Sequence, residues 1–507
     1  MKVNSVKAWR TRKATEWSVF CEALDFGALV PQAYEKYRPA IVEGLLFFLE
    51  NLEEDRASEI LIEQALLPGA VGVAERMVAI ARHCPALHKL GQVLARDRRL
   101  PATFRLLLQN LESMPSSLDV DEARALAEVE LGPLAKFGIR IDEPPLAEAS
   151  VAVVMPFTGE QTGISRGVLK LLKPGIEARL EEELGILQRL GALLDERCEA
   201  FQLPRIAYAQ TFSEVRDLLA REVRLDEEQA HMKAAGAAWS HLPAIVIPEV
   251  YSFSTPRMTA MQRIDGGKVT NASALSPGAR RRLGNLIVKA LIARPLWSAG
   301  EESVFHADPH AGNLFATDDG KLAILDWSLV GTLSKADRVS LTQLVLGAFT
   351  LDGARVRAAI DTLSRGRSDA AALEAIIAAG MRRLSDGAWP GISWVTDLLD
   401  DAATGARCHF GADLLMFRKA LQTIQGVVAA VAADCRPDRV LTFALLRTLA
   451  AAWGQRSYTL PYSRHFATHL SNLDLTQLFV SAPLIGQRQL YGLPSTLSRL
   501  RRIASAR

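Results

Sequence analysis

The chain has 507 residues, too many for one hydrophobic core, and a size of about 150 residues per domain predicts roughly two to four domains. Hydrophobic residues make up 49% and charged residues 23%, which excludes a disordered or fibrous protein. The 59 Lys and Arg residues nearly balance the 57 Asp and Glu residues, so we expect no nucleic-acid partner. The five cysteines form no CxxC pair, which excludes a zinc ribbon or disulfide framework visible in the spacing and favours a reducing, cytoplasmic compartment.

The sequence predicts no transmembrane segment. The longest run without Asp, Glu, Lys or Arg, residues 234–248, is 15 residues long and contains Pro243 and Pro248, whereas a span needs roughly 20 apolar residues. The basic start of the chain lacks the apolar core of a secretory signal. It is either a solvated helix start or a surface helix on which Trp9 and Trp17 contact anionic lipid.

Hydrophobic periodicity predicts helices up to about residue 134, with breaks at proline and glycine. Short β-branched and apolar runs then predict strands, of which the second and third form a hairpin; these runs are 138–142, 150–157 and 166–173. Helical sequence follows over 176–238, and two further strands are expected at 245–251 and 257–264. From residue 279 the pattern is helical again, apart from a mixed segment at 304–333.

This order of elements predicts an α+β fold with two lobes and a ligand cleft between them. We expect four regions, whose limits are 1–134 for a helical N-terminal extension, 135–268 for a small β-rich lobe with a helical insertion, 269–365 for the core of a second lobe, and 366–507 for a helical C-terminal region.

The mixed segment VFHADPHAGNLFATDDGKLAILDWSLVG (304–331) contains four polar residues of interest, namely His306, Asp308, Asn313 and Asp326. Two short apolar runs flank its Asp-Asp-Gly turn and predict a hairpin that holds Asn313 and Asp326 at one end. Phosphoryl transfer needs one carboxylate that orients or deprotonates the acceptor, and an Asn and a second carboxylate that hold magnesium. The segment follows the kinase pattern H-x-D-x-x-x-x-N with a later Asp, although Trp327 and Ser328 replace the usual Phe and Gly.

A metal site built from His306 and His310 is a weaker alternative. Pro309 lies between the two histidines and makes one regular helical face unfavourable. No acidic third ligand stands at a standard spacing.

Lys170 alternates with apolar residues on a strand that is expected to be buried, where a lysine is costly unless it is paired. Its partner should be a glutamate on a nearby helix, and Glu222, Glu227 and Glu228 are the candidates. Lys173, just before Pro174, is expected to be solvated.

With these residues in place, roughly residues 80–335 resemble the UbiB/AarF family of atypical protein-kinase-like proteins. Lys89 and Gln92 match the family's KxGQ motif, and residues 145–152, with Ala149 and Ser150, resemble its Ala-rich loop. The resemblance assigns the remaining positions as follows: Lys170 corresponds to the strand lysine, Glu222 to the first acid of the ExD motif, and Glu228 to the helix glutamate that pairs with the lysine.

The chain departs from the family pattern at several positions. Arg224 replaces the Asp of ExD, Val153 and Met155 stand where Gln and His are usual, and Gln262 stands near the usual hinge Glu. The C-terminal membrane segments of some members have no counterpart in this sequence.

The resemblance implies a kinase-like fold whose N-terminal extension packs over the cleft, and an ATPase or a small-molecule or lipid-directed phosphotransferase that uses ATP or ADP with Mg²⁺. In this interpretation Asp308 orients or deprotonates the acceptor, and Asn313 and Asp326 ligate magnesium. Lys170 contacts the phosphates and Glu228 pairs with it. Ala149 and Ser150 line the nucleotide site, whereas Lys89, Gln92 and Glu222 regulate access to it.

Two alternatives stay open. Asp326-Trp327 also resembles small-molecule kinases of the aminoglycoside/choline type, although Ser328 replaces their second acid. The second alternative is non-catalytic: a nucleotide-gated scaffold that helps to assemble a biosynthetic complex. Its basic tail would contact a membrane or a partner through Arg488, Arg499, Arg501, Arg502 and Arg507. For the leading hypothesis we expect a lipid or isoprenoid substrate, as in ubiquinone biosynthesis, and a cytoplasmic protein with a peripheral membrane contact.

Overall fold

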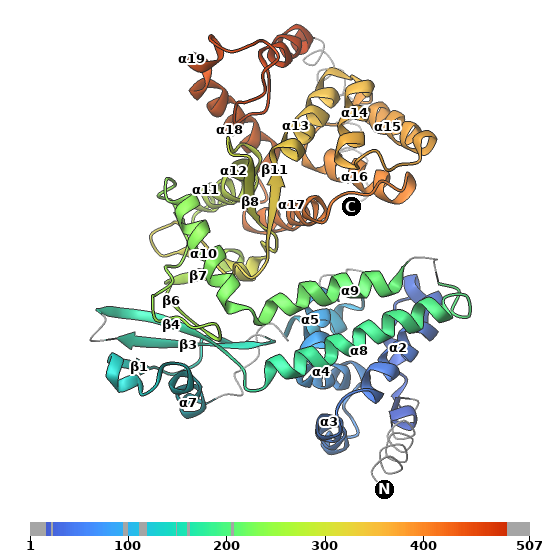
Figure 1. Cartoon of the computed structure of the whole chain (residues 1–507), viewed down its shortest axis with the longest axis vertical. Coiled ribbons are helices and arrows are strands. Elements are labelled where there is room, and N and C mark those ends of the chain that lie inside the picture. Colours follow the sequence, from blue (N-terminus) through green and yellow to red (C-terminus); the bar gives the residue numbers. More distant parts are fainter. Residues whose placement is uncertain are drawn as a thin grey trace. The chain divides into compact units, whose positions relative to one another are not determined.

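The computed structural model describes residues 17–21, 24–94, 100–110, 119–148, 150–159, 163–203 and 207–483. These residues form two compact units (Figure 1). Unit 1 runs to Ala230 and takes in Glu249–Arg263, whereas unit 2 consists of His231–Pro248 and the chain from Ile264 onward. Unit 1 joins a sheet to a set of helices, and unit 2 is mostly helical with short strands, so the α+β class is confirmed.

The sheet of unit 1 is antiparallel and has the strand order β1 (Ile139–Ile141), β3 (Ala152–Gly159), β4 (Ile164–Leu172) and β6 (Met258–Gln262). A two-residue strand, β2 (Ala147–Glu148), also pairs with β3. Alternating side chains of the strands form one core with α7 (Val120–Leu131), whose Ala123 and Ala127 are fully buried. The strands predicted at 138–142, 150–157, 166–173 and 257–264 are therefore confirmed.

Helices account for the rest of unit 1, and α8 and α9 run side by side along it (Figure 1). Their bounds are α2 Arg38–Glu50, α3 Glu54–Leu66, α4 Val73–His83, α5 Pro85–Leu94, α6 Ala102–Asn110, α8 Ile176–Arg197, α9 Tyr208–Leu219 and α10 Leu225–Trp239, the last of which continues into unit 2. Two short 3-10 helices, η1 (Phe26–Leu29) and η2 (Gln32–Tyr37), precede α2.

Trp17 is fully buried in the helical core of unit 1, where it shares a cluster with Phe48, Ile60 and Ile186. The expectation that Trp17 lies on a solvated or lipid-facing helix is therefore wrong, because its indole is part of the packing between helices. Trp9 and the basic start of the chain lie outside the described residues.

A buried arginine joins α3 to α8. Arg56 makes ion pairs with both Glu182 and Glu183, and the backbone amide of Ala86 donates to the carboxylate of Glu183 at 2.7 Å. Burial raises the pKa of Glu183 to about 7, although the charge of Arg56 opposes this change. The helices before the sheet are thus linked to α8 by charges as well as by apolar contacts.

Unit 2 contains a four-stranded sheet and a two-stranded ribbon. The sheet has the order β5 (Ile245–Val246), β10 (Leu322–Ile324), β9 (Leu314–Thr317) and β7 (Gly266–Lys268). The ribbon pairs β8 (Glu302–His306) with β11 (Val330–Ser334). The strand predicted at 245–251 is shortened to two residues and belongs to this sheet, in parallel with β10, because an apolar run does not specify its partner strand.

The remaining elements of unit 2 are helices, as the sequence predicts beyond residue 335. Their bounds are α11 Pro277–Val288, the π-helical turn η6 Lys289–Ala293, α12 Arg294–Leu296, α13 Lys335–Thr350, α14 Gly353–Leu363, α15 Ala370–Ser385, α16 Ile392–Gly405, α17 Ala412–Val431, α18 Pro437–Ala451 and α19 Trp453–Arg456.

Among the described residues, α17 is long and apolar enough to cross a membrane by length and composition. Helices that form the core of a globular unit pass the same criterion. Leu414, Phe417, Ile424 and Val428 of α17 are buried, and Phe417 packs edge-on against Phe305 of β8. We therefore interpret α17 as a core helix of unit 2.

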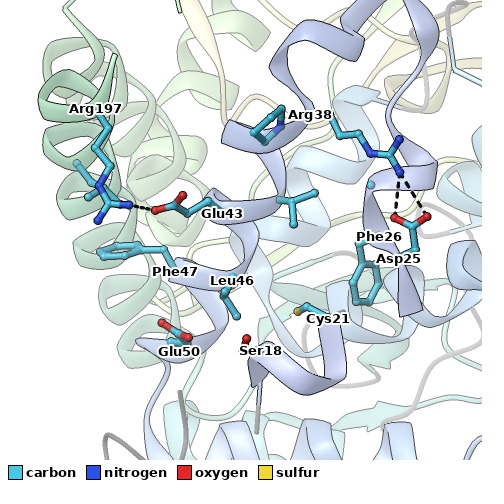
Figure 2. A pocket seen from close by; sticks show the side chains of 14 residues that line it. Ser18, Cys21, Asp25, Phe26, Arg38, Glu43, Leu46, Phe47, Glu50 and Arg197 are labelled. Atoms are coloured by element: carbon cyan, nitrogen blue, oxygen red, sulfur yellow. Dashed lines mark hydrogen bonds and ion pairs between the residues drawn. The ribbon is translucent and has the colours of Figure 1, made fainter. Parts of the chain in front are cut away.

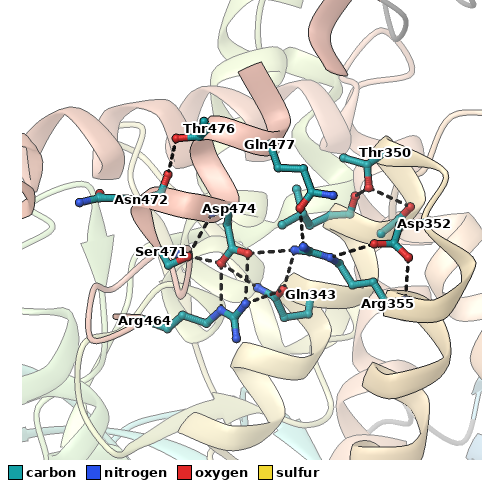
Figure 3. A network of polar contacts seen from close by, with 12 residues as sticks. Gln343, Thr350, Asp352, Arg355, Arg464, Ser471, Asn472, Asp474, Thr476 and Gln477 are labelled. Atoms are coloured by element: carbon teal, nitrogen blue, oxygen red, sulfur yellow. Dashed lines mark hydrogen bonds and ion pairs between the residues drawn. The ribbon is translucent and has the colours of Figure 1, made fainter. Parts of the chain in front are cut away.

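The segment after α19 is attached to α13 and α14 by a network of polar contacts around Asp474 (Figure 3). The side chain of Asp474 is 3% exposed and accepts hydrogen bonds from Arg355 at 2.9 Å and from Arg464 at 2.9 and 3.1 Å. Gln343 and the backbone amide of Ser471 also donate to this carboxylate. Burial alone would raise the pKa of Asp474, but these hydrogen bonds hold it well below its ordinary value.

We predict that Asp474→Asn lowers the free energy of unfolding by about 3 kcal/mol, because two arginines then face a neutral group inside unit 2. The wild-type contribution is fully present above pH about 4, the unfolded pKa of an aspartate, and disappears as the pH falls through the lower folded pKa. Denaturant unfolding as a function of pH measures both effects. Asp361→Asn, which removes a partly exposed pair with Arg357, is the control and should cost about 1 kcal/mol or less. Equal effects of the two substitutions would contradict the assignment.

Candidate functional site

Lys170 projects from β4 in unit 1, where it lies between Val154 of β3 and Thr259 of β6 in the sheet register. Its ammonium group donates to both carboxylate oxygens of Glu228, at 2.9 and 2.8 Å. The side chains of Lys170 and Glu228 are only 11% and 2% exposed. An ion pair so deeply buried is expensive to form and needs this two-oxygen geometry to compensate for lost hydration.

The structure distinguishes the three glutamates that the sequence offers to Lys170. Glu228 pairs with Lys170, whereas Glu222 pairs with Lys89 at 2.8 Å. Glu227 lies 3.2 Å from the guanidinium of Arg224 at the start of α10. The predicted pairing of Lys170 with a helix glutamate is confirmed, and each of the other two candidates has a different cation.

Gln229, the residue after Glu228, fixes the start of α10 to the sheet. Its amide nitrogen donates to the backbone oxygen of Thr255 at 2.8 Å and to the hydroxyl of Thr259 at 3.0 Å. Thr259 is the residue opposite Lys170 on β6. The glutamate and the lysine are therefore positioned by one set of contacts between α10 and the sheet.

Arg224 stands half-exposed before the first turn of α10. Its guanidinium donates to both oxygens of Asp226, at 3.1 and 3.0 Å, and these hydrogen bonds lower the pKa of Asp226. Its carbonyl accepts from the backbone amides of Glu227 and Glu228. The arginine in place of the ExD aspartate thus stabilises the beginning of the helix that carries Glu228.

Lys89 lies on α5 and Glu222 on a short 3-10 helix, η4 (Ala220–Val223), and both side chains are about one-quarter exposed. Their ion pair connects the KxGQ position with the first ExD position inside unit 1. The side chain of Gln92 lies outside the described residues. The regulatory role of these three residues stays a prediction.

The Ala-rich segment leads into β3 and is attached to the end of β4 by an ion pair. Glu148 of β2 lies 2.5 Å from Lys173, so the expectation that Lys173 is solvated is wrong. The carboxylate comes from β2, which pairs with β3 and not with β4, so no local pattern in the sequence places it beside Lys173. Ser150 is buried, whereas Ala149 lies outside the described residues. Val153 and Met155 are fully buried in the sheet core.

In unit 2, the predicted hairpin between Asn313 and Asp326 is present as β9 and β10. The backbone amide of Leu325 donates to the carbonyl of Asn313 at 2.8 Å, which holds the two ends of the hairpin together. Gly320 has a φ of 81° in the turn, a conformation that glycine adopts without strain. Asn313 and the residue before Asp326 are thus neighbours, as the sequence predicts.

His306 organises the backbone of this loop from a fully buried position. Its Nε2 lies 3.0 Å from the carbonyl of Leu325, and its Nδ1 accepts from the backbone amide of Asp308 at 3.3 Å. Because Nδ1 accepts a hydrogen bond and Nε2 faces a carbonyl, this geometry assigns the ring proton to Nε2, and burial lowers the pKa of His306. His306 therefore has a structural role, and the alternative metal site with His310 is not favoured.

Asn313 is also buried and fixes the loop around Asp308. Its side-chain nitrogen donates to the carbonyl of Asp308 at 3.1 Å, which makes the amide oxygen the atom suited to a cation. The carboxylate of Asp308 is 18% exposed and lies 3.8 Å from the ring of His310. The loop thus presents one carboxylate and one amide oxygen from a short stretch of backbone.

Asp326 has a φ of 49°, in the left-handed region that is uncommon for a residue other than glycine. Ser328 supports this conformation, since its hydroxyl and its backbone amide donate to one oxygen of Asp326 at 2.6 and 3.2 Å. A residue held in a sparsely populated conformation is typical of a functional site. The serine that replaces glycine is therefore a partner of the predicted metal ligand.

Trp327 is a residue whose role the sequence pattern did not identify. Its indole is fully buried, donates to the carbonyl of Ile324 at 3.1 Å and packs edge-on against Trp239 and His306. The ring of His231 lies 3.1 Å from its carbonyl oxygen. The two tryptophans are 88 positions apart in sequence, and no local signal pairs them.

The donor set suits a magnesium–nucleotide complex better than an isolated metal ion. Asn313 and Asp326 offer hard oxygen atoms, and Mg²⁺ commonly takes only one or two protein ligands and completes its shell with phosphates and water. Within the described part of the chain, no group of three or more His, Cys, Asp or Glu side chains is placed to hold a metal ion. The residues therefore fit the ion that the sequence predicts.

A separate hollow of about 800 Å³ lies among the helices of unit 1 (Figure 2). Its apolar wall includes Leu46 and Phe47 of α2, and two ion pairs border it, Arg38 with Asp25 and Arg197 with Glu43. No local pattern in the sequence indicates this hollow, because its lining comes from separate helices. None of the predicted site residues lines it.

The buried lysine–glutamate pair on a sheet, together with a hairpin loop that carries Asp308, Asn313 and Asp326, defines a protein of the kinase-like class. Residues 110–360, about half of the chain, match the model of the ABC1 atypical kinase-like domain. The chain belongs to the UbiB/AarF family of atypical kinase-like proteins.

Three curated proteins illustrate the relationship. A probable protein kinase UbiB of Xanthomonas euvesicatoria pv. vesicatoria is 28% identical over 299 residues, which cover 56% of this chain and 52% of that protein. The uncharacterized protein MT0675 of Mycobacterium tuberculosis is 31% identical over 279 residues, 52% of this chain and 53% of its own. A probable protein kinase UbiB of Marinobacter nauticus is 27% identical over 280 residues, 53% and 49% of the two chains. The chain thus spans about half the length of these relatives.

Among solved structures, the complex of Rv3197 with erythromycin from Mycobacterium tuberculosis aligns with a TM-score of 0.48 and 16% sequence identity. The alignment covers 75% of this chain and 95% of that one.

We predict that Lys170→Met lowers the free energy of unfolding by about 3–5 kcal/mol, because Glu228 is then buried without its ammonium partner. The double variant Lys170→Met/Glu228→Leu should recover most of this loss, since an apolar pair of similar size carries no desolvation penalty. Denaturant unfolding of both variants measures the coupling.

Lys321→Met, which breaks an exposed pair with Asp319, is the control for this experiment and should cost about 1 kcal/mol or less. If the double variant is as unstable as the sum of its two single variants, Lys170 and Glu228 are not coupled and the interpretation of the pair is wrong.

Proposed function

We propose that the protein is a magnesium-dependent ATPase or atypical phosphotransferase that serves ubiquinone or other lipid and isoprenoid metabolism. The observation that carries this proposal is the buried pair of Lys170 with Glu228. A buried ion pair is a poor source of stability, so its presence on the sheet of unit 1 needs another reason. Binding of phosphate by the lysine supplies that reason.

Lys170 acts in this proposal as the phosphate contact, and Glu228 fixes the direction of its flexible side chain. Kinases use a strand lysine and a helix glutamate in the same way. Both oxygens of Glu228 accept from Lys170, so the ammonium group is held in one direction by a two-oxygen contact. Ala149 and Ser150 are the proposed backbone neighbours of the nucleotide.

Asn313 and Asp326 act as the magnesium ligands. Asn313 supplies an amide oxygen and Asp326 supplies a carboxylate, and both are oxygen ligands of the type that a hard cation prefers. The ion, when bound, neutralises charge on the phosphates. Asp308 orients or deprotonates the acceptor, which is water in an ATPase and a hydroxyl compound in a phosphotransferase.

Lys89, Gln92 and Glu222 regulate nucleotide access in the same proposal. The ion pair of Lys89 with Glu222 links α5 to the segment directly before α10, the helix that carries Glu228. A change at the KxGQ position can therefore reach the residue that orients Lys170 through a continuous set of contacts. The names of the UbiB relatives support a kinase-like activity, and a lipid or isoprenoid acceptor and a biosynthetic complex are the proposed partners.

We predict that Asp326→Asn lowers magnesium-dependent ATP turnover roughly 10²–10³-fold, because the phosphates lose one anionic ligand of their counter-ion. A coupled ADP-release assay over a magnesium titration measures this loss. Asp319→Asn, in the exposed turn of the same hairpin, is the matched control and should leave turnover unchanged. Unaltered turnover and metal dependence in the Asp326 variant would refute the role of Asp326.

A double-mutant cycle tests whether Lys170 and Asp326 act on the same nucleotide. We expect the effects of Lys170→Met and Asp326→Asn on ATP affinity to be non-additive by at least about 0.5 kcal/mol, as for residues that share a ligand. Isothermal titration of ATP with excess magnesium, on variants that circular dichroism finds folded, gives the four affinities. Strict additivity would argue for two independent sites.

A further inference from the structure

Unit 2 has an unusual concentration of exposed aromatic side chains near its end. Six large aromatic side chains are exposed in the described part of the chain, and five of them lie between Phe443 and Phe479. Trp453 is 70% exposed and Tyr458 is 94% exposed. The exposed aromatic side chains are thus concentrated in one segment of unit 2, and such a concentration is typical of an interaction site.

The spacing along α18 places several of these residues on one face of the helix. Arg439, Phe443 and Leu446 follow each other at intervals of four and three residues, and all three are exposed. Ala452, which joins α18 to α19, keeps a right-handed helical backbone, so Trp453 continues the same row. From Phe443 to Trp453 this row is about 15 Å long. Val440 of α18 is buried. The helix α18 contacts α11 and η6.

The loop after α19 extends this surface and is held firmly in unit 2. Tyr458, Leu460 and Tyr462 are exposed, whereas Arg456 is buried and stacks over the ring of Phe466 at 3.9 Å. Arg456 also donates to the carbonyl of Leu470 and to the hydroxyl of Thr468. The Asp474 network fixes the next turn to α13 and α14 (Figure 3). We name the exposed residues Phe443, Leu446, Trp453, Tyr458, Leu460 and Tyr462 the aromatic surface.

The exposed charged side chains of α18 are arginines, whereas Asp438 at its start is partly buried and accepts from the backbone amide of Ile392 at 2.9 Å. Arg439 and Arg447 are exposed on α18, and the guanidinium of Arg439 lies 5.7 Å from the ring of Phe443. Asp474 is the sole carboxylate in residues 439–483, and it is buried and paired with two arginines. Asp434, just before α18, is paired with Arg281. The surface therefore presents aromatic rings and cations without an exposed carboxylate of its own segment.

We infer that the aromatic surface docks on an anionic lipid bilayer. Tryptophan and tyrosine rings favour the headgroup level of a membrane, where an apolar ring and a polar edge are both satisfied. Arginines beside them are attracted to anionic lipid, and a helix that lies in the membrane plane with such a face binds without crossing it. A second copy of the chain is a less suitable partner, because Arg439 and Arg447 would face like charges across a symmetric contact.

Flotation with lipid vesicles tests this inference on the full chain. The vesicles are phosphatidylcholine alone or phosphatidylcholine with phosphatidylglycerol, each at low and high salt. We expect the wild type to float with the phosphatidylglycerol vesicles and to be released by salt. Arg439→Gln/Arg447→Gln should weaken this binding roughly 30-fold, and Trp453→Ser/Tyr458→Ser should weaken it at both salt concentrations.

Arg365→Gln/Arg367→Gln removes the same charge from an exposed loop after α14 and is the matched control. This control variant should float like the wild type, and thermal melting should find all variants equally folded, because the changed side chains are exposed. Equal weakening by the control would attribute binding to net charge and overturn the inference. Absence of salt-sensitive flotation would also overturn the inference. The same holds if light scattering finds a dimer that the α18 variants dissociate and that lipid does not affect.

Discussion

The buried contact between Lys170 and Glu228 is the constraint on which the rest of the candidate site depends. A lysine in the interior of a sheet is tolerated only with a compensating carboxylate, and that carboxylate must come from an element that crosses the end of the sheet. The start of α10 meets this need, and Gln229 and Arg224 fix its first turn by separate hydrogen bonds. Even the arginine that departs from the family's ExD motif therefore contributes to the position of Glu228.

Much of unit 1 could be predicted from the sequence because its signals are local. The strands β3 and β4 contain short apolar runs, and a lysine inside such a run demands an acidic partner. The choice among Glu222, Glu227 and Glu228 could not be made in the same way, because it depends on which cation lies beside each glutamate in space. The structure gives each of the three a different cation.

The hairpin of unit 2 was equally visible in the sequence, since its turn and its two apolar runs are consecutive. The strand predicted at 245–251 is present only at its first two residues and lies in the sheet of unit 2. A short apolar run fits either sheet, and its parallel partner β10 comes more than 70 positions later in the chain. The Asp474 network and the burial of Trp17 were invisible for the same reason. Contacts between positions far apart in the chain leave no periodic pattern in a single sequence.

Trp327 has a consequence for how this protein can be observed. Its indole is adjacent in the chain to Asp326 and packs against the indole of Trp239 with ring centres 5.4 Å apart. Two indoles at this distance couple optically, and their orientation sets the sign and size of the near-ultraviolet circular dichroism. Trp327 directly follows Asp326, whose backbone conformation is unusual, so the protein carries an intrinsic spectroscopic reporter beside its proposed metal ligand.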